Sequence, residues 1–109
     1  MTVADAVAEV VLGRGARHVF GLVGSGNLAL VNALLRGGAS YHAACHEAGA
    51  VAAADAYARV SRRVGVATVH QGPGLTNALT ALTEAVRAHT PLVLLASEAV
   101  AGNQRLDQA

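Results

Sequence analysis

This sequence of 109 residues contains no lysine and no tryptophan, a single cysteine, and only 3% aromatic residues. Eight arginines against seven acidic residues give a formal net charge of +1, which leaves no basic surface for binding the phosphates of nucleic acid. So few aromatic side chains also exclude a platform on which bases stack. One cysteine excludes a disulfide framework and a zinc site built from thiolates.

The sequence also lacks an apolar run of the ~20 residues that a membrane-spanning helix needs. Its first residues include Asp5 and Glu9 and no basic segment followed by an apolar core, so we expect no signal peptide, no membrane partner and a cytoplasmic protein. Charged residues make up 14% and apolar residues 53%, which excludes intrinsic disorder. With so few charges, we expect an unusually apolar surface of the kind that contacts other chains.

What the sequence does contain is a regular alternation of helical and strand patterns. Apolar spacing or high alanine content predicts helices at residues 2–12, 28–35, 47–63 and 75–89. Short β-branched or continuous apolar runs predict strands at residues 18–23, 40–45, 64–69 and 91–96. This order predicts an α/β fold, a three-layer open parallel sheet of about four strands with helices on both faces. In such a fold, ligands bind in the loops at the carboxyl ends of the strands.

The loop after the first predicted strand reads Gly24-x-Gly26-x-x-Ala29. It matches the dinucleotide-binding pattern G-x-G-x-x-G/A, and Glu47, 21 residues after Gly26, would stand where an acid meets a ribose hydroxyl. A simpler interpretation is that a tight turn from strand to helix needs glycine for a positive φ angle. A Rossmann-like dinucleotide-binding module is therefore one alternative function.

Glu47 also opens the alanine-rich third helix, directly after His46. An acid in the first turn is stabilised by the helix dipole, whereas a catalytic acid would need burial. A third loop, residues 70–77, has the sequence HQGPGLTN, in which a rigid turn aims backbone N–H groups at a planar ligand edge or an anion. The alternative interpretation is that this loop has no ligand and only starts a helix, which Thr76 or Asn77 caps.

The remaining histidines, His18, His42 and His89, have no metal-ligand spacing among themselves. We interpret them as structural or surface residues, and the sequence predicts no metal site.

Taken together, these segments resemble the N-terminal pyrimidine-binding domain of thiamine-diphosphate enzymes of the acetolactate synthase type. The resemblance runs from Ala4 to about Gln108 and depends on five segments in the right order and at the right spacing. They are FGLVG (20–24), HEAGA (46–50) with ADAYAR (54–59), VGV (64–66), GPGLTN (72–77), and the stretch 84–93. The resemblance implies a single domain over residues 1–109, and an incomplete one, because a full domain of this kind has roughly 150 residues.

The resemblance also implies a role for each matching residue. Glu47 would be the catalytic acid: it would hydrogen-bond N1′ of the aminopyrimidine ring and so activate the cofactor for attack on a 2-keto acid, in decarboxylation or carboligation. Cofactor contacts are implied for Val23, Gly24, Glu47, Pro73 and Asn77. Substrate contacts are implied for Ser25, His70, Gln71 and Gln108.

Partners outside this chain follow from the same resemblance. The diphosphate group and Mg²⁺ would be held by a different domain of a partner subunit, in a homo-oligomer, and the full enzyme would be able to bind FAD. We therefore expect the isolated chain to be inactive, and a non-catalytic remnant that only dimerises is the second alternative. The chain departs from the family at Val23, where proline is frequent, at Gln71, where serine or threonine is frequent, and at Arg63, where glycine is usual. The departures at Val23 and Gln71 leave the identity of the substrate undetermined.

Overall fold

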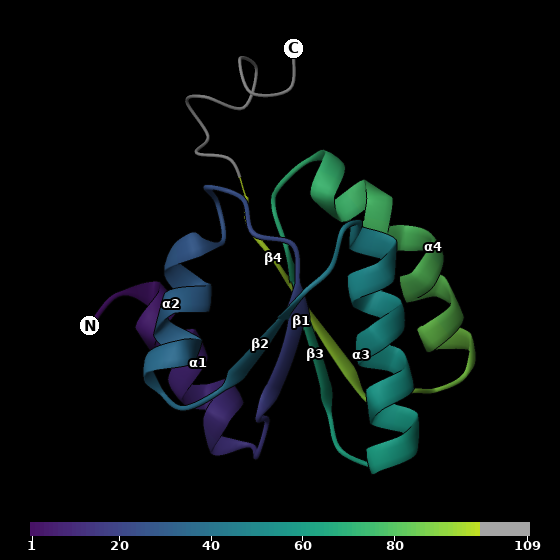
Figure 1. Ribbon diagram of the computed structural model, residues 1–109, viewed down its shortest axis with the longest axis horizontal. Helices are drawn as coiled ribbons and strands as arrows, with labels where there is room; N and C mark the ends of the chain where they lie inside the picture. The colour runs from purple at the N-terminus through teal and green to yellow at the C-terminus, as the bar shows by residue number, and fades with distance from the viewer. Residues whose placement is uncertain (99–109) are drawn as a thin grey trace.

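The computed structural model describes residues 1–98, which form one parallel sheet with helices on both faces (Figure 1). Helices α1 and α2 cover one face, and α3 and α4 cover the other. This confirms the predicted three-layer α/β fold. In chain order the elements are α1 (Val3–Gly13), β1 (His18–Gly21), α2 (Leu28–Arg36), β2 (Ser40–Ala43), α3 (Glu47–Ser61), β3 (Gly65–Val69), α4 (Pro73–Arg87) and β4 (Leu92–Ala96).

The helix boundaries follow local chemistry. Thr2 and Asp5 form a capping box at the start of α1, in which each side chain accepts a hydrogen bond from the other residue's backbone N–H at 3.1 Å. Helix α4 begins at Pro73, two residues before its predicted start, because the first helical position needs no N–H. Helix α3 ends at Ser61, two residues before its predicted end, and Arg62 follows with a left-handed φ of 60°.

The four strands lie in the order β2-β1-β3-β4 and are all parallel. From β1 the chain moves out to β2 at one edge, then crosses back over β1 to β3 and on to β4 at the other edge. The direction of winding therefore reverses between β1 and β3, where Val19 pairs with Val66 and Gly21 with Thr68. At such a switch point, the loops leaving two neighbouring strands part to opposite faces and open a crevice for a ligand.

Small residues let the helices pack closely against the sheet. Strand β3 is buried along its whole length, and a Cβ atom at Gly65 would collide with the carbonyl oxygen of Ala54 on α3. The core has one cluster on each face of the sheet, around Val19 and Leu34 under α1 and α2, and around Val51 and Val69 under α3 and α4. The high alanine content therefore sets a short distance between layers.

A buried carboxylate connects α3 to the turn before β4. Asp55 is 7% exposed, and its Oδ1 accepts hydrogen bonds from Thr90 Oγ1 at 2.6 Å and from Arg59 Nε at 2.8 Å. Its Oδ2 accepts a further hydrogen bond from Arg59 Nη2 at 2.8 Å. The hydrogen bonds from Arg59, followed by that from Thr90, hold the pKa of Asp55 below its usual value, against the opposing effect of burial. The ionised form of Asp55 therefore stabilises the fold.

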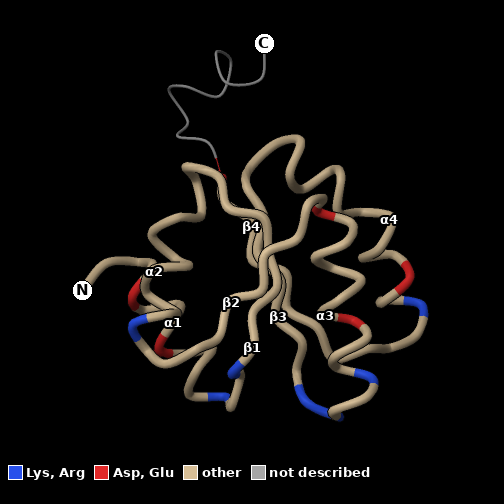
Figure 2. The backbone as a smooth tube through the Cα atoms, viewed as in Figure 1, with Lys and Arg blue, Asp and Glu red and all other residues tan. Residues whose placement is uncertain are grey.

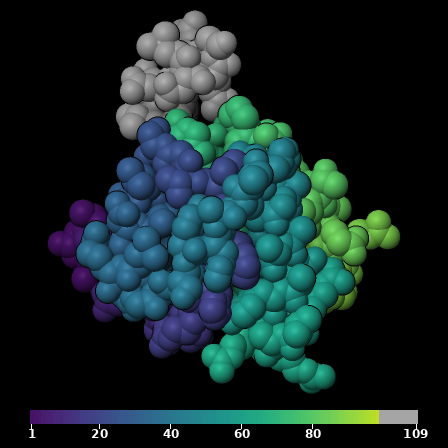
Figure 3. All heavy atoms as spheres, in the orientation of Figure 1, coloured from purple at the N-terminus to yellow at the C-terminus, as the bar shows by residue number. Residues whose placement is uncertain are grey.

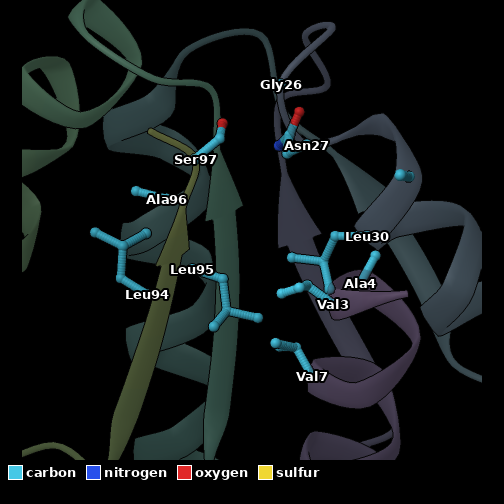
Figure 4. Close-up of a pocket in the computed structure, with 11 residues that line it drawn as sticks. Val3, Ala4, Val7, Gly26, Asn27, Leu30, Leu94, Leu95, Ala96 and Ser97 are labelled. Carbon is cyan, nitrogen blue, oxygen red and sulfur yellow. The ribbon is translucent and has the colours of Figure 1, made fainter. Parts of the chain in front are cut away.

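The surface is apolar in places, as the composition predicts. Val3 on α1, Val60 on α3 and Val86 on α4 are 81%, 87% and 64% exposed. A groove of about 380 Å³ runs between α1 and β4, with apolar walls and with Asn27 and Ser97 at its mouth (Figure 4). Figure 3 shows the opposite edge of the sheet, where β2 reaches the surface between α2 and α3.

Within residues 1–98, no helix has the length and apolarity needed to span a bilayer.

Candidate functional site

Three loops meet at the carboxyl end of the sheet, at the top of Figure 1. They are the segments 22–27 after β1, 44–46 after β2 and 70–72 after β3, the same three loops that the sequence singles out. The Arg residues in the described part of the chain lie away from this end, whereas Glu47 lies at it (Figure 2). In the described part of the chain, this end of the sheet therefore carries Glu47 and, after β4, Glu98, but no arginine.

Glu47 is the first residue of α3 and is half-buried. His46 precedes it as the helix cap, with its Nδ1 accepting a hydrogen bond from the Ala48 N–H at 2.9 Å. Because His46 satisfies that backbone donor, the Glu47 side chain is not needed as a cap. The ion pairs found within residues 1–98 involve Asp5, Asp55 and Glu84 but not Glu47. No salt bridge of the described residues therefore holds the Glu47 carboxylate.

Asn77 on α4 contacts the carboxylate of Glu47. Its Nδ2 donates to Glu47 Oε1 at 3.4 Å, a long hydrogen bond that crosses from α4 to α3. Gly74, in the first turn of α4, lies between Glu47 and His70: a Cβ atom there would stand 3.7 Å from Glu47 Oε2 and 3.3 Å from the Cβ of His70. The structure therefore brings two of the predicted segments, 46–50 and 70–77, together at Glu47.

The two glycines after β1 are needed for a reason that differs from the sequence interpretation. Neither Gly24 nor Gly26 has a positive φ angle. A Cβ atom at Gly24 would lie 2.7 Å from Cγ of His70, and one at Gly26 would lie 2.6 Å from Nδ1 of the same ring. The Gly26 N–H donates to that Nδ1 at 3.0 Å. The expectation of a left-handed turn was wrong, and the glycines make room for the His70 ring.

This packing also argues against the dinucleotide-binding alternative. In that pattern the second glycine lets a pyrophosphate approach the backbone. Here the space beside Gly26 is filled by His70 and by the Ser97 hydroxyl, which would lie 2.5 Å from a Cβ atom at Gly26. The glycine motif is thus occupied by the protein's own side chains.

Asn27 is a site residue that no motif in the sequence indicates. It is 2% exposed, and its Oδ1 accepts from the Gly24 N–H at 2.8 Å. Its Nδ2 donates to Leu22 O at 3.3 Å and to Thr68 Oγ1 at 3.2 Å, and the Thr68 hydroxyl donates to Leu95 O at 2.9 Å. Asn27 therefore fixes the loop after β1 to β3 and β4, and only its pairing with Thr68, 41 residues away, shows this role.

The other residues implied by the resemblance lie around this centre. Val23, Ser25 and Pro73 are exposed, and Gln71 is half-buried. Gln108, the remaining candidate for substrate contact, lies outside the described residues. Within residues 1–98, no group of three or more His, Cys, Asp or Glu side chains is placed to hold a metal ion.

Relatives of known activity resemble this chain over nearly its whole length. A sulfoacetaldehyde acetyltransferase from Castellaniella defragrans is 37% identical over 99 residues, which are 91% of this chain and 17% of that protein. A 2-hydroxyacyl-CoA lyase 2 from Danio rerio is 45% identical over 95 residues, or 87% of this chain and 15% of that protein. The chain thus spans only about a sixth of the length of these curated relatives.

The fold has solved counterparts in the same group of enzymes. A thiamine diphosphate-dependent 4-hydroxybenzoylformate decarboxylase from Rhodococcus jostii RHA1 superposes with a TM-score of 0.87 at 29% identity, covering 100% of this chain and 20% of that one. The family described as "Thiamine pyrophosphate enzyme, N-terminal TPP binding domain" matches residues 1–108. This chain therefore belongs to the family of N-terminal TPP-binding domains of thiamine pyrophosphate enzymes.

Proposed function

We propose that this chain holds the aminopyrimidine ring of thiamine diphosphate and that Glu47 is the acid that activates it. The observation that carries the proposal is the state of the Glu47 carboxylate. It is half-buried, forms no ion pair within residues 1–98, and is contacted by a neutral amide, Asn77 Nδ2, at 3.4 Å. Such a carboxylate suits a ring nitrogen that shares a proton, because no cation of the described residues occupies its oxygens.

When bound, thiamine diphosphate supplies the electron sink for breaking or forming a bond next to a carbonyl group. The protein supplies orientation and a proton position. Glu47 Oε would share its proton with N1′ of the ring, and Asn77 would keep the carboxylate turned toward it by donating to Oε1. Gly74 leaves the space beside Glu47 Oε2 free of a side chain, so a flat ring is able to approach. The described residues therefore fit the group.

His70 would face the substrate as a hydrogen-bond donor. Its Nδ1 accepts from the Gly26 N–H at 3.0 Å, so the neutral ring must carry its proton on Nε2. Packing against Gly24 and Gly74 keeps the ring in place. A fixed Nε2–H donor is suited to an oxygen of a carbonyl or carboxylate group. With Ser25, Gln71 and Gln108 it would determine which substrate is accepted.

We infer that the whole enzyme is of the acetolactate synthase type and acts on a 2-keto acid. The names of the relatives, an acetyltransferase, a lyase and a decarboxylase, support chemistry beside a carbonyl carbon. The diphosphate and Mg²⁺ would be held by another domain, in a partner subunit of a homo-oligomer, with FAD as an additional cofactor. Support for a separate domain is that this chain covers only 17% and 15% of the length of the two relatives.

The decisive experiment grafts this chain onto a relative in place of its own N-terminal segment, for example in the 2-hydroxyacyl-CoA lyase that is 45% identical to it. Exchange of the thiazolium C2 proton of bound thiamine diphosphate is then followed by NMR in deuterated water. We expect Glu47→Gln to slow the exchange by about 10²-fold or more, the usual contribution of a positioned acid or base.

Glu9→Gln is the matched control, since Glu9 is exposed on α1, and it should leave the exchange rate unchanged. Unchanged exchange in the Glu47→Gln graft would overturn the catalytic assignment. An active graft would also dismiss the alternative of a domain that only dimerises.

A further inference from the structure

Two histidines that the sequence treats separately lie side by side at the sheet edge away from β4. His18 is on β1 and His42 is on the edge strand β2. In the register, His42 pairs with Phe20, so His18 is its diagonal neighbour on the same face. The Nδ1 atom of His18 and the Nε2 atom of His42 are 3.0 Å apart. Two imidazole nitrogens thus face each other at hydrogen-bond distance near the surface.

We propose that His18 and His42 form a chelating site for a divalent transition-metal ion of the Zn²⁺, Ni²⁺ and Cu²⁺ class. An imidazole nitrogen binds such ions at about 2.0–2.1 Å, so two nitrogens at an angle of about 90–109° stand about 2.9–3.3 Å apart. The separation of 3.0 Å between His18 Nδ1 and His42 Nε2 falls within this range. On binding, the proton of the hydrogen bond between the two rings moves to the other nitrogen of its own ring. Both rings then turn so that the two free lone pairs meet at the ion, which lies beside the line joining His18 Nδ1 and His42 Nε2.

The rings are held in place by aromatic neighbours. The His42 ring stacks on Phe20 with centroids 4.9 Å apart and planes at 26°. The His18 ring packs against Tyr57 of α3 with centroids 5.3 Å apart, and Tyr57 also contacts Phe20. These contacts restrict both imidazoles to few rotamers, so little side-chain entropy is lost when an ion binds. The two rings are therefore held close together before an ion binds.

Exposure and neighbouring groups define the kind of ion. His42 is exposed and His18 is half-buried, so the ion is reached from solvent and water fills its remaining coordination positions. Within residues 1–98, no third His, Cys, Asp or Glu completes the set. Imidazole ligands select borderline cations over Mg²⁺ and Ca²⁺, and Cu²⁺ binds more tightly than Ni²⁺ or Zn²⁺. A bound ion would clip the edge strand β2 to β1.

The test is calorimetric titration of the chain with NiCl₂, ZnCl₂ and MgCl₂ in separate experiments. The background carries Cys45→Ser, because the exposed Cys45 thiol binds such metals itself. We expect one Ni²⁺ or Zn²⁺ ion per chain, no heat with Mg²⁺, and an affinity at least tenfold lower in His18→Asn and in His42→Asn. The matched control is His89→Asn, at an exposed turn whose φ of 56° asparagine tolerates, and it should bind as the parent does.

A second measurement uses the unsubstituted chain and does not depend on any variant folding. Zn²⁺ added during an NMR experiment should shift the ring signals of His18 and His42 at a lower concentration than those of the other histidines. Equal affinity in the two asparagine variants and the parent, or first shifts at other histidines, would show that His18 and His42 only share a proton. Either result would overturn the proposal.

Discussion

The contact between Gly26 and His70 gives the sharpest test of the site's construction. Replacing Gly26 with alanine would put a Cβ atom 2.6 Å from His70 Nδ1 and 2.5 Å from Ser97 Oγ. Serine is able to rotate away, but the His70 ring is also packed against Gly24 and Gly74. The ring must therefore move, and the hydrogen bond from the Gly26 N–H to Nδ1, now 3.0 Å long, is strained or lost.

The expected cost follows from three contributions. Overpacking costs about 1–3 kcal/mol, and the hydrogen bond contributes about 1 kcal/mol. The lower entropy of alanine in the unfolded chain offsets about 0.4–1 kcal/mol. We therefore expect Gly26→Ala to lower the free energy of unfolding by about 2 kcal/mol, measured by urea denaturation, with the Tm reduced by roughly 10 °C.

Two further variants identify the cause. Gly49→Ala on α3 is the matched control, because Gly49 is exposed, its new Cβ would meet only Ala44 at 3.9 Å, and helix propensity predicts a gain of about 0.5–1 kcal/mol. In the background His70→Ala, the cost of Gly26→Ala should fall by at least half, since the obstructing ring is gone. An undiminished cost in that background, or a Gly26→Ala chain as stable as the parent, would refute the role assigned to His70.

Three other predictions concern groups that fix the loops and helices. Asp55→Asn should destabilise the chain by about 2 kcal/mol, because the amide cannot accept all three hydrogen bonds from Arg59 and Thr90. Because the pKa of Asp55 is lowered in the folded chain, the stability that its ionised form contributes is fully present above the unfolded pKa of about 3.9. That stability is lost as the pH falls through the folded pKa. Below about pH 4, the free energy of unfolding of the parent, measured with urea, should therefore depend on pH more steeply than that of Asp55→Asn. Asn27→Ala should cost about 2–3 kcal/mol in the same assay, since it removes the donor to the buried Thr68 Oγ1 and the acceptor of the Gly24 N–H. A cost below about 0.5 kcal/mol would contradict this network. Arg62→Gly should raise the Tm, because glycine adopts the left-handed φ of 60° without strain, whereas Arg63→Gly should not.

The prediction for Arg62 concerns the end of α3, where the sequence comparison with the family points to Arg63, one residue later. Glycine is expected at Arg63, yet the left-handed residue that ends α3 is Arg62. Helix ends fray, and the cap position depends on how the last turn packs, so sequence patterns locate it only to within a residue or two. The same uncertainty explains why α4 begins at Pro73 rather than at the predicted residue 75.

The sequence by itself determined the order of helices and strands, the parallel sheet and the identity of the family. These features follow from local patterns, namely the period of apolar residues in the helices and the continuous apolar run that becomes β4. The resemblance to the family also implied cofactor contacts for Glu47 and Asn77, and in the fold a hydrogen bond joins these two side chains. Their assignment to the cofactor remains a prediction.

Only the tertiary structure decided which distant side chains touch. It seated His70 against Gly24 and Gly26, paired Asn27 with Thr68, and brought His18 to within 3.0 Å of His42. The physical reason is that strand order and register, not spacing along the chain, set these distances, and the order β2-β1-β3-β4 makes neighbours of strands that are not consecutive. In the sequence Gly26 has the pattern of a turn residue, but in the fold its missing side chain leaves room for the ring of His70, 44 residues away.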